Sequence, residues 1–325
     1  MATAAPSRRP AAPSDSLHAR AREVLATVKS VCPHTDADGL AAGAIALRAI
    51  GKPAAFATLL GRGQTPFGPT PPLPPGPAAV LDWGVRPLGR PGVIVDHHAP
   101  EADPTDDQIL VSGYGQEHVS TAVLMRRVCP DAPAWLAAVG AAGDYGDDGL
   151  KLPECAGVVK AHVKRLVPLI NAPRRLPDGP VRDALALLVE HDSPKDALAD
   201  ERIELLEQAK LEWRTGFDAA VRTAPRIAGD VAVLRFASPY QVHPLVATTW
   251  SRRLAPKVVI AANDNYLPGM VNFAARGGPD RLDLRKLLRN ALPDVTGEFA
   301  HGHDKATGGS LSFADFERLM KGLGF

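Results

Sequence analysis

The chain has 325 residues, 45% of them hydrophobic, and a formal net charge of +1 at pH 7. This length accommodates about two domains, and the near-neutral charge excludes a global basic field that would draw the whole molecule to nucleic acid. No apolar stretch is long enough to span a bilayer, and the three scattered cysteines fit neither a disulfide framework nor a zinc ribbon, so we expect a cytoplasmic protein that is not membrane-bound.

Helical and strand patterns alternate through the first half, which predicts an α/β domain of the doubly wound kind, built on a parallel sheet. Residues 1–17 are rich in Ala, Pro, Ser and Arg and are expected to form a disordered tail, with a transit peptide as the less favoured alternative. The expected elements are, in chain order, a helix over 17–29, a strand over 30–32, a helix over 40–50, a stiff proline-rich loop over 68–77, strands over 78–81 and 92–95, and helices over 120–128 and 134–142.

Three of the expected strands are followed by Asp or His side chains. These are His34, Asp36 and Asp38 after the first strand, Asp82 after the second, and Asp96, His97 and His98 after the third. In an open parallel sheet the carboxyl ends of the strands form the edge where ligands bind. Carboxylates and imidazoles without thiolates suit Mn²⁺ or Mg²⁺ better than a soft metal.

The spacing within the first of these groups admits two interpretations. His34, Asp36 and Asp38 alternate, so an extended segment would point all three side chains to one side, and Gly39 would then allow a tight turn into the next helix. The structural alternative makes Asp38 only the cap of that helix and Asp36 a turn residue.

Asp144 is expected at the end of an alanine-rich helix, where its charge opposes the helix dipole and calls for a compensating cation. Taken together, the acidic and imidazole positions could hold two metal ions about 3.5–4 Å apart, with Asp82 as a bridge and an activated water aimed at phosphorus. His98 would then face the substrate. The metal-ligand candidates are His34, Asp36, Asp38, Asp82, His97 and Asp144.

The second half begins with a charged segment, 183–224, whose helical period predicts a long connecting helix. A second α/β unit is expected beyond it. Its elements are strands over 231–236, 257–262, 270–275 and 310–313 and helices over 244–254, 282–292 and 316–323.

A glycine-rich turn with a basic centre is expected over 301–309, where backbone N–H groups could face an anion. Arg276 closes a strand beside Gly277 and could hold a phosphate or stack on a base, although a surface salt bridge is an equally good explanation. The substrate-binding candidates are Arg276, Gly302, His303, Gly308 and Gly309.

This succession of motifs resembles the DHH/DHHA1 phosphoesterase superfamily, with its RecJ-like and oligoribonuclease-like members. The matching positions are His34-x-Asp36-x-Asp38-Gly39, Asp82-x-Gly84, Asp96-His97-His98, Gly143-Asp144 and Gly302-His303-x-x-Ala306-x-Gly308-Gly309. Asn171 and Arg175 also resemble a stretch that follows the DHH core in RecJ-type members.

The resemblance implies a DHH catalytic domain over 18–185, a helical linker over 186–224 and a smaller α/β DHHA1 substrate-binding domain over 225–325. It implies two Mn²⁺ ions, with Mg²⁺ as the alternative, on the six ligand candidates. It also implies catalytic roles for His98 and Asp96, and orienting a histidine is one role open to Asp96. The substrate candidates above match the substrate loop of the second domain.

The expected activity is metal-dependent hydrolysis of phosphodiester bonds in single-stranded nucleic acid or short oligonucleotides. The alternatives are a small-nucleotide phosphatase, acting on phosphoadenosine phosphate or a cyclic dinucleotide, and a catalytically silent nucleic-acid-binding subunit. The chain is poor in aromatic residues and has no basic stripe, which argues against processive degradation of long DNA. DNA versus RNA and the oligomeric state stay open.

Overall fold

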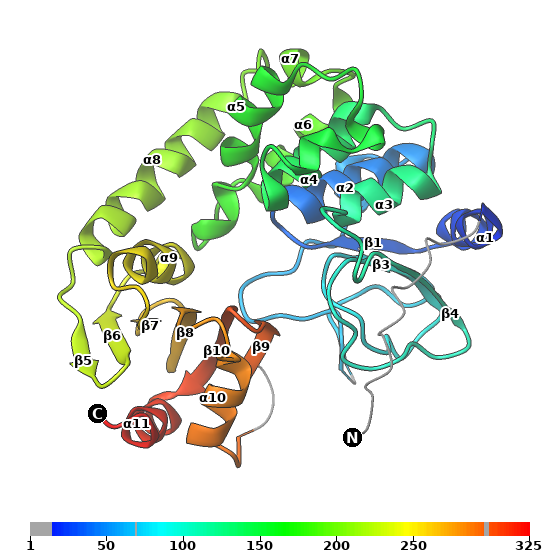
Figure 1. Cartoon of the computed structure of the whole chain (residues 1–325). Coiled ribbons are helices and arrows are strands. Elements are labelled where there is room, and N and C mark those ends of the chain that lie inside the picture. The colour runs from blue at the N-terminus through cyan, green and yellow to red at the C-terminus, as the bar shows by residue number, and fades with distance from the viewer. Residues whose placement is uncertain (1–14, 69, 296–298) are drawn as a thin grey trace. The chain divides into compact units, whose positions relative to one another are not determined.

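The computed structural model describes residues 15–68, 70–295 and 299–325, with the backbone alone at residues 15 and 301–303. The chain divides into two compact units, each with its own sheet (Figure 1). The first comprises residues up to Arg174 together with 180–207, and the second comprises 175–179 and 208–325. Among the described helices, none is both long and apolar enough to cross a membrane.

The sheet of the first unit has four parallel strands in the order β1-β2-β3-β4. They are β1 (Ser30–Pro33), β2 (Ala78–Leu81), β3 (Gly92–Asp96) and β4 (Gln108–Ser112). The three expected strands and the parallel sheet are therefore confirmed, and β4 is an addition. Because all four strands run the same way, their carboxyl ends share one edge of the sheet.

Helices cover only one face of this sheet. Ala79 and Leu81 of β2 pack with α1, α2 and α3 in the main core, whereas Val80 faces Leu60, Phe67 and other loop side chains. The expectation of a doubly wound domain is thus wrong for the first unit. The other face of the sheet is covered by loop residues, including Leu73 of the proline-rich loop, which cannot form a helix.

The helices of the first unit are α1 (Asp15–Leu25), α2 (Ala37–Ala49), α3 (Thr121–Val128), α4 (Ala134–Tyr145), α5 (Lys160–Ile170), α6 (Val181–Glu190), α7 (Pro194–Ala197) and the start of α8 (Ile203–Ala220), as Figure 1 shows. Residues 15–17 are helical rather than part of a tail, and the earlier residues lie outside the described part of the chain. The single helix expected over 183–224 is wrong, because Ser193 caps a new helix and Pro194 cannot continue the preceding one.

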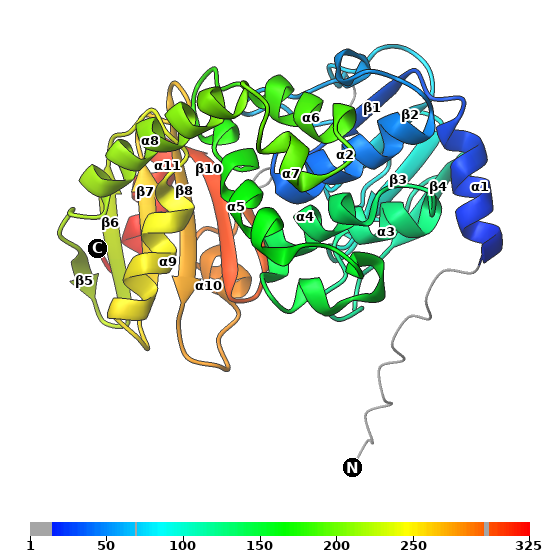
Figure 2. The same ribbon diagram turned by 90° about the horizontal axis from the view of Figure 1, so that it is seen from above.

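The second unit has a mixed sheet in the order β5-β6-β7-β8-β10-β9, in which only β6 and β7 are parallel. Its strands are β5 (Arg226–Ala228), β6 (Val231–Phe236), β7 (Val258–Asn263), β8 (Met270–Gly277), β9 (Phe299–His303) and β10 (Ala306–Ser312). Helix α9 (His243–Arg253) covers one face, and α10 (Leu284–Ala291) and α11 (Phe313–Gly322) cover the other (Figure 2). The expected second α/β unit is confirmed.

The glycine-rich segment near the C-terminus is a hairpin rather than a turn. Gly308 and Gly309 lie within β10, and the tight connection to β9 falls at Asp304 and Lys305. A Cβ on Gly308 would approach the carbonyl oxygen of Phe273 on β8 to 2.4 Å. The glycine is therefore needed for the close approach of two strands.

Candidate metal centre

The segment after β1 is extended at Asp36 but becomes helical before Asp38, which corrects one interpretation of the sequence. Asp36 is the N-cap of α2, and its Oδ1 accepts a hydrogen bond from the Gly39 amide at 3.0 Å. Asp38 lies in the first turn of that helix. The helix starts earlier than expected because Asp36 satisfies one of its free amides.

Gly39 lies where the chain turns tightly from β1 into α2. A Cβ at this position would lie 2.4 Å from the carbonyl oxygen of His34. The glycine thus permits α2 to begin directly against the end of β1, which brings His34, Asp36 and Asp38 close together.

Asp38 is fully buried and held by the N-terminus of a second helix. Its two carboxylate oxygens accept hydrogen bonds from the amides of Thr121 at 2.7 Å and Ala122 at 2.8 Å, at the start of α3. Buried backbone donors at a helix N-terminus stabilise a negative charge. They also fix the direction in which the remaining lone pairs of Asp38 point.

Asp82 follows β2 in a left-handed backbone conformation, with φ of 68°. Such a conformation is costly for a residue other than glycine and is found at functional sites. The Thr121 hydroxyl donates to its Oδ1 at 2.9 Å. Asp82 is only 5% exposed, and its carboxylate lies between the two histidines that follow β1 and β3.

His97 directs Nε2 toward three carboxylates. The distances are 3.4 Å to Oδ1 of Asp82, 3.3 Å to Oδ2 of Asp144 and 3.9 Å to Oδ2 of Asp38. On the other side of the ring, Nδ1 lies 2.9 Å from the Tyr145 hydroxyl. A neutral ring that carries its proton on Nδ1 would donate it to the Tyr145 hydroxyl and present its Nε2 lone pair to the carboxylates.

His34 and Asp36 form the opposite side of the cluster. Nδ1 of His34 lies 2.8 Å from Oδ2 of Asp36 and 3.7 Å from Oδ2 of Asp82. Arg174 also donates to Oδ2 of Asp36 at 2.9 Å. The chain itself therefore supplies a guanidinium group to the cluster.

Asp96 and His98 form a separate pair. Asp96 is fully buried, and its carboxylate accepts from the Gly84 amide at 2.6 Å, the His98 amide at 2.7 Å and Nδ1 of His98 at 2.9 Å. These hydrogen bonds fix the orientation of the His98 imidazole. Asp96 therefore orients His98 and does not itself point at the other carboxylates.

The described side chains contain three sets that could each hold a metal ion, with ligand atoms within 4.8 Å of one another. The sets are His34, Asp36 and Asp82; Asp38, His97 and Asp144; and Asp82, His97 and His98. Asp82 also lies 3.4 Å from His97, so it links the first set to the second. All six ligand candidates and His98 are thus brought to one place at the edge of the sheet.

The electrostatics of the cluster indicate a need for positive charge. Burial and the charge of Asp82 raise the pKa of Asp38 to about 7, and burial with the charges of Asp38 and Asp82 raises the pKa of Asp144 well above its usual range. Burial alone would lower the pKa of His97, but its hydrogen bond to Asp82 and the surrounding carboxylates raise it to about 12. Burial would likewise lower the pKa of His34, but the charge of Asp36 raises it to about 10.

This donor set fits divalent metal ions. Oxygen and imidazole ligands suit Mn²⁺ or Mg²⁺, and a cation would relieve the repulsion that raises the pKa values of the two carboxylates.

Three further residues support the cluster but were not identified from the sequence. Thr121 donates to both Asp38 and Asp82, Tyr145 holds His97, and Arg174 contacts Asp36. Tyr145 directly follows Asp144 in the sequence, so of the three supporting residues it is the one that could most readily have been predicted. Asn171 accepts from the first amide of α2 at 3.0 Å, whereas its expected companion Arg175 contacts Gln241 and the Trp213 ring in the second unit.

The substrate-binding candidates lie in the second unit. In the strand register Ala306 of β10 is opposite Arg276 of β8 on one side and opposite His303 of β9 on the other. The side chains of Gly302 and His303 are outside the described part of the structure. Lys305, the basic residue of the hairpin, donates to the carbonyls of Leu282, at 2.9 Å, and Pro279.

Arg276 is a half-buried cation. Its Nη1 donates to the carbonyls of Ala275 at 2.9 Å and Thr307 at 3.1 Å, and burial lowers the pKa of its guanidinium. Of the described carboxylates, none forms an ion pair with Arg276. A half-buried guanidinium with only carbonyl partners has capacity for an anion.

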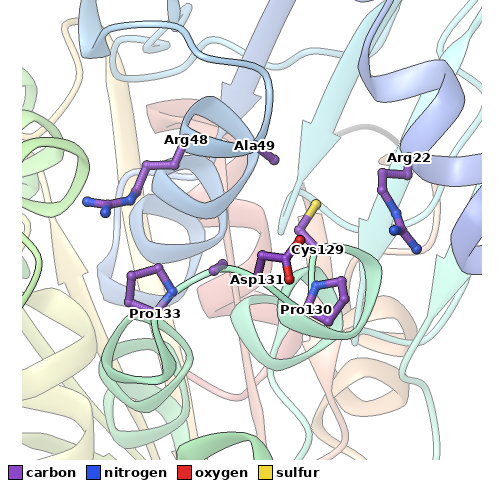
Figure 3. A pocket seen from close by; sticks show the side chains of 8 residues that line it. Arg22, Arg48, Ala49, Cys129, Pro130, Asp131 and Pro133 are labelled. Atoms are coloured by element: carbon purple, nitrogen blue, oxygen red, sulfur yellow. The ribbon is translucent and has the colours of Figure 1, made fainter.

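A pocket of about 390 Å³ lies elsewhere in the first unit (Figure 3). Arg48 and Cys129, which line it, are at the C-terminal ends of α2 and α3, opposite the helix ends that hold the carboxylates. Arg48 points away from Cys129 and donates to the carbonyls of Val189 and His191 at 2.9 and 2.8 Å. This pocket is thus separate from the candidate metal centre.

Comparison with known proteins identifies the fold. No family model matches the chain, and no curated protein sequence matches it. Solved structures do match, and one of them is a DHH domain, so the fold is the one that the resemblance led us to expect.

The structure of the exonuclease RecJ bound to manganese is 21% identical and has a TM-score of 0.64, over 96% of this chain and 94% of that one. RecJ of Thermus thermophilus in complex with Mn²⁺ is 21% identical with a TM-score of 0.65 over 96% of this chain, which spans only 55% of that longer protein. The DHH domain of a protein assigned to a family of ribosomal proteins is 15% identical with a TM-score of 0.59, over 94% of this chain and 88% of that one.

Proposed function

We propose that this protein is a metal-dependent phosphoesterase that hydrolyses phosphodiester bonds in single-stranded nucleic acid or short oligonucleotides. The observation that carries the proposal is Asp82, a strained and buried carboxylate that two sets of potential metal ligands share. The fold is that of RecJ, an exonuclease solved with bound manganese, and this supports both the reaction class and the ion.

In this proposal one Mn²⁺ ion is held by His34, Asp36 and Asp82 and a second by Asp38, Asp82, His97 and Asp144, with Mg²⁺ as the alternative ion. When bound, the ions would acidify a water for attack on phosphorus and neutralise charge on the phosphoryl oxygens.

The chain's own residues prepare the site in three ways. The amides of α3 hold Asp38, and Thr121 holds Asp82, so two carboxylates are fixed before anything binds. Tyr145 fixes the ring of His97. Asp96 turns Nε2 of His98 away from itself, and a hydrogen bond from protonated His98 to a phosphoryl or leaving oxygen of the substrate would stabilise the negative charge there.

The protonation of His98 is favoured by its surroundings. Partial burial would lower its pKa, but the hydrogen bond to Asp96 and the charge of Asp82 raise it. His98 is therefore more often a donor at neutral pH than a free histidine. This suits a residue that faces an anionic substrate.

We assign substrate binding to the second unit, over the predicted domain 225–325, and catalysis to the first, over 18–185. Arg276 supports this assignment, because its guanidinium has no carboxylate partner among the described residues and would bind a substrate phosphate. Ala306 of β10 pairs with Arg276 of β8 and with His303 of β9, so the backbones of Arg276 and His303 lie at the same level of the sheet, with β10 between them.

A hydrolysis panel with Mn²⁺, and with EDTA as control, tests the proposal. The substrates are 2-mer and 20-mer RNA and DNA, a cyclic dinucleotide, phosphoadenosine phosphate and pyrophosphate. Cleavage of the oligomers to mononucleotides supports the proposal, whereas turnover of phosphoadenosine phosphate or the cyclic dinucleotide alone supports the small-nucleotide alternative. No turnover with metal shown to be bound supports a silent binding subunit.

A matched pair of variants links activity to the cluster. Asp82→Ala should abolish turnover, while Asp106→Ala, which removes an exposed carboxylate from the loop before β4, should leave it unchanged. Full activity of Asp82→Ala would exclude the two-metal account.

A further inference from the structure

Beyond β4 a loop carries an exposed aromatic ring beside the candidate metal centre. Tyr114 is 49% exposed, although large hydrophobic side chains are otherwise mostly buried in this unit. The residue before it, Gly113, donates to the carbonyl of Asp96 at 2.8 Å, and a Cβ on Gly113 would lie 3.2 Å from Cβ of His97. One peptide further on, Cα of Tyr114 is at most about 9 Å from Cβ of His97.

The backbone that carries this ring is firmly held. The Tyr114 amide donates to the Ser112 hydroxyl at 3.2 Å, and Nε2 of Gln116 donates to the Ser112 carbonyl at 3.3 Å. Arg127 of α3 in turn donates to Oε1 of Gln116 at 2.7 Å. Tyr114 is thus an exposed side chain on an ordered support, which lowers the entropy that a ligand must remove on binding it.

The far end of the same loop also leads to the metal centre. His118 has a positive φ of 56°, and its ring centroid is 5.5 Å from that of Tyr145, whose hydroxyl bonds to His97. Backbone strain of this kind persists where surrounding contacts impose it, typically at functional sites. Both ends of the loop are therefore tied to His97, and Tyr114 lies between them.

We propose that Tyr114 is the surface on which a nucleobase of the substrate stacks next to the bond that is cleaved. This inference rests on the proposed phosphodiester hydrolysis and adds a substrate contact to it. The Cα atom of Tyr114 lies within about 9 Å of Cβ of His97, a separation that one nucleotide can span between its phosphate and its base. No other aromatic ring of the described residues contacts this one.

Stacking is tolerant of base identity, because every base has a π face. The protein should therefore require a base beside the scissile phosphate without selecting which base. The hydroxyl of Tyr114 is not needed for this role, so a phenylalanine should replace it.

The test compares three dinucleotides with Mn²⁺: one intact, one abasic at the first position and one abasic at the second. For the wild-type protein, removal of the stacked base should raise KM by about 5- to 160-fold, the range that base stacking on an aromatic residue represents. Tyr114→Ala should raise KM for the intact dinucleotide by the same factor, with kcat little changed, and should not discriminate against the abasic ones. Tyr114→Phe should behave as wild type.

Ile227→Ala is the matched control, since it removes a 53% exposed side chain from the edge strand β5. An unchanged KM in Tyr114→Ala, or an equal loss on intact and abasic substrates, would overturn the stacking role. The same comparison is made on Kd by titration calorimetry, so binding without turnover still decides the inference. A wild-type protein that neither binds nor cleaves any of the dinucleotides would overturn the proposed function as well.

Discussion

Gly140 provides a sharp test of how the metal centre is supported. It lies within α4, where a Cβ would be 2.3 Å from Oδ1 of Asp38 and 2.4 Å from Cβ of Ala122. Ordinary contact begins at 3.4 Å, so the buried carboxylate would have to move by about 1 Å. Gly140→Ala should therefore favour the helix by its higher helix propensity, but it should also displace Asp38, a potential metal ligand.

The competing effects have opposite signs and different sizes. Replacing glycine with alanine inside a helix stabilises it by about 1 kcal/mol. Overpacking a buried site costs about 1–3 kcal/mol, and a displaced Asp38 would weaken its charged hydrogen bonds to α3, which contribute about 1.5–3 kcal/mol each. We expect Gly140→Ala to lower the free energy of unfolding by about 2–5 kcal/mol and to weaken Mn²⁺ binding at least about tenfold.

Gly143→Ala, one turn along α4, is the matched control, because its Cβ would lie nearest to Cβ of Ala37, at 3.0 Å, with no carboxylate oxygen among its three nearest neighbours. Its stability should stay within about 1 kcal/mol of wild type, and its affinity for Mn²⁺ should be retained. Urea denaturation followed by circular dichroism measures the first quantity and titration calorimetry the second. A Gly140→Ala protein as stable as Gly143→Ala, with wild-type Mn²⁺ affinity, would refute the reasoning.

Three further predictions concern single contacts. Tyr145→Phe removes the partner of Nδ1 of His97 and should weaken Mn²⁺ binding about 10- to 100-fold without unfolding the protein; titration calorimetry measures this, and unchanged affinity would count against the role of the hydroxyl. Mn²⁺ binding should release protons and tighten as pH rises from about 6 to about 8, because the raised pKa values of His34 and His97 keep both rings protonated in the metal-free protein; enthalpies independent of buffer ionisation would contradict this. Arg276→Ala should raise KM for an oligonucleotide while Mn²⁺ affinity is unchanged, and an unaltered KM would remove it from the substrate site.

The strand ends could be predicted from the sequence because the runs before them are continuous and apolar. Val93, Ile94 and Val95 are buried, with their side chains on alternate faces of the sheet. Such a continuous apolar run is typical of a parallel strand that is covered on both faces. Once the strands are parallel, the side chains after them must share one edge. The convergence of Asp82 and His97 follows from that geometry alone.

The elements that were missed lack such a pattern. Strand β4, Gln108–Ser112, is short and only partly buried, with polar residues at both ends. Gly308 and Gly309 suggest a turn, because glycine is common in turns. They lie in a strand instead, and the close contact with β8 that favours this strand is remote in sequence. The sequence allowed Asp36 to be a turn residue or a ligand, and no local feature shows that it caps α2 or that its two oxygens divide between Gly39 and His34.

Departures from local preference gather at one place in the first unit. Asp82 has a positive φ, Gly39 permits an approach of 2.4 Å to the backbone of His34, and Gly140 leaves room for Asp38 inside a helix. Each costs stability or propensity where it occurs, and each brings a carboxylate nearer to others of like charge. Local preferences are thus overridden where like charges are brought together, and this supports the proposal that a cation binds at this place.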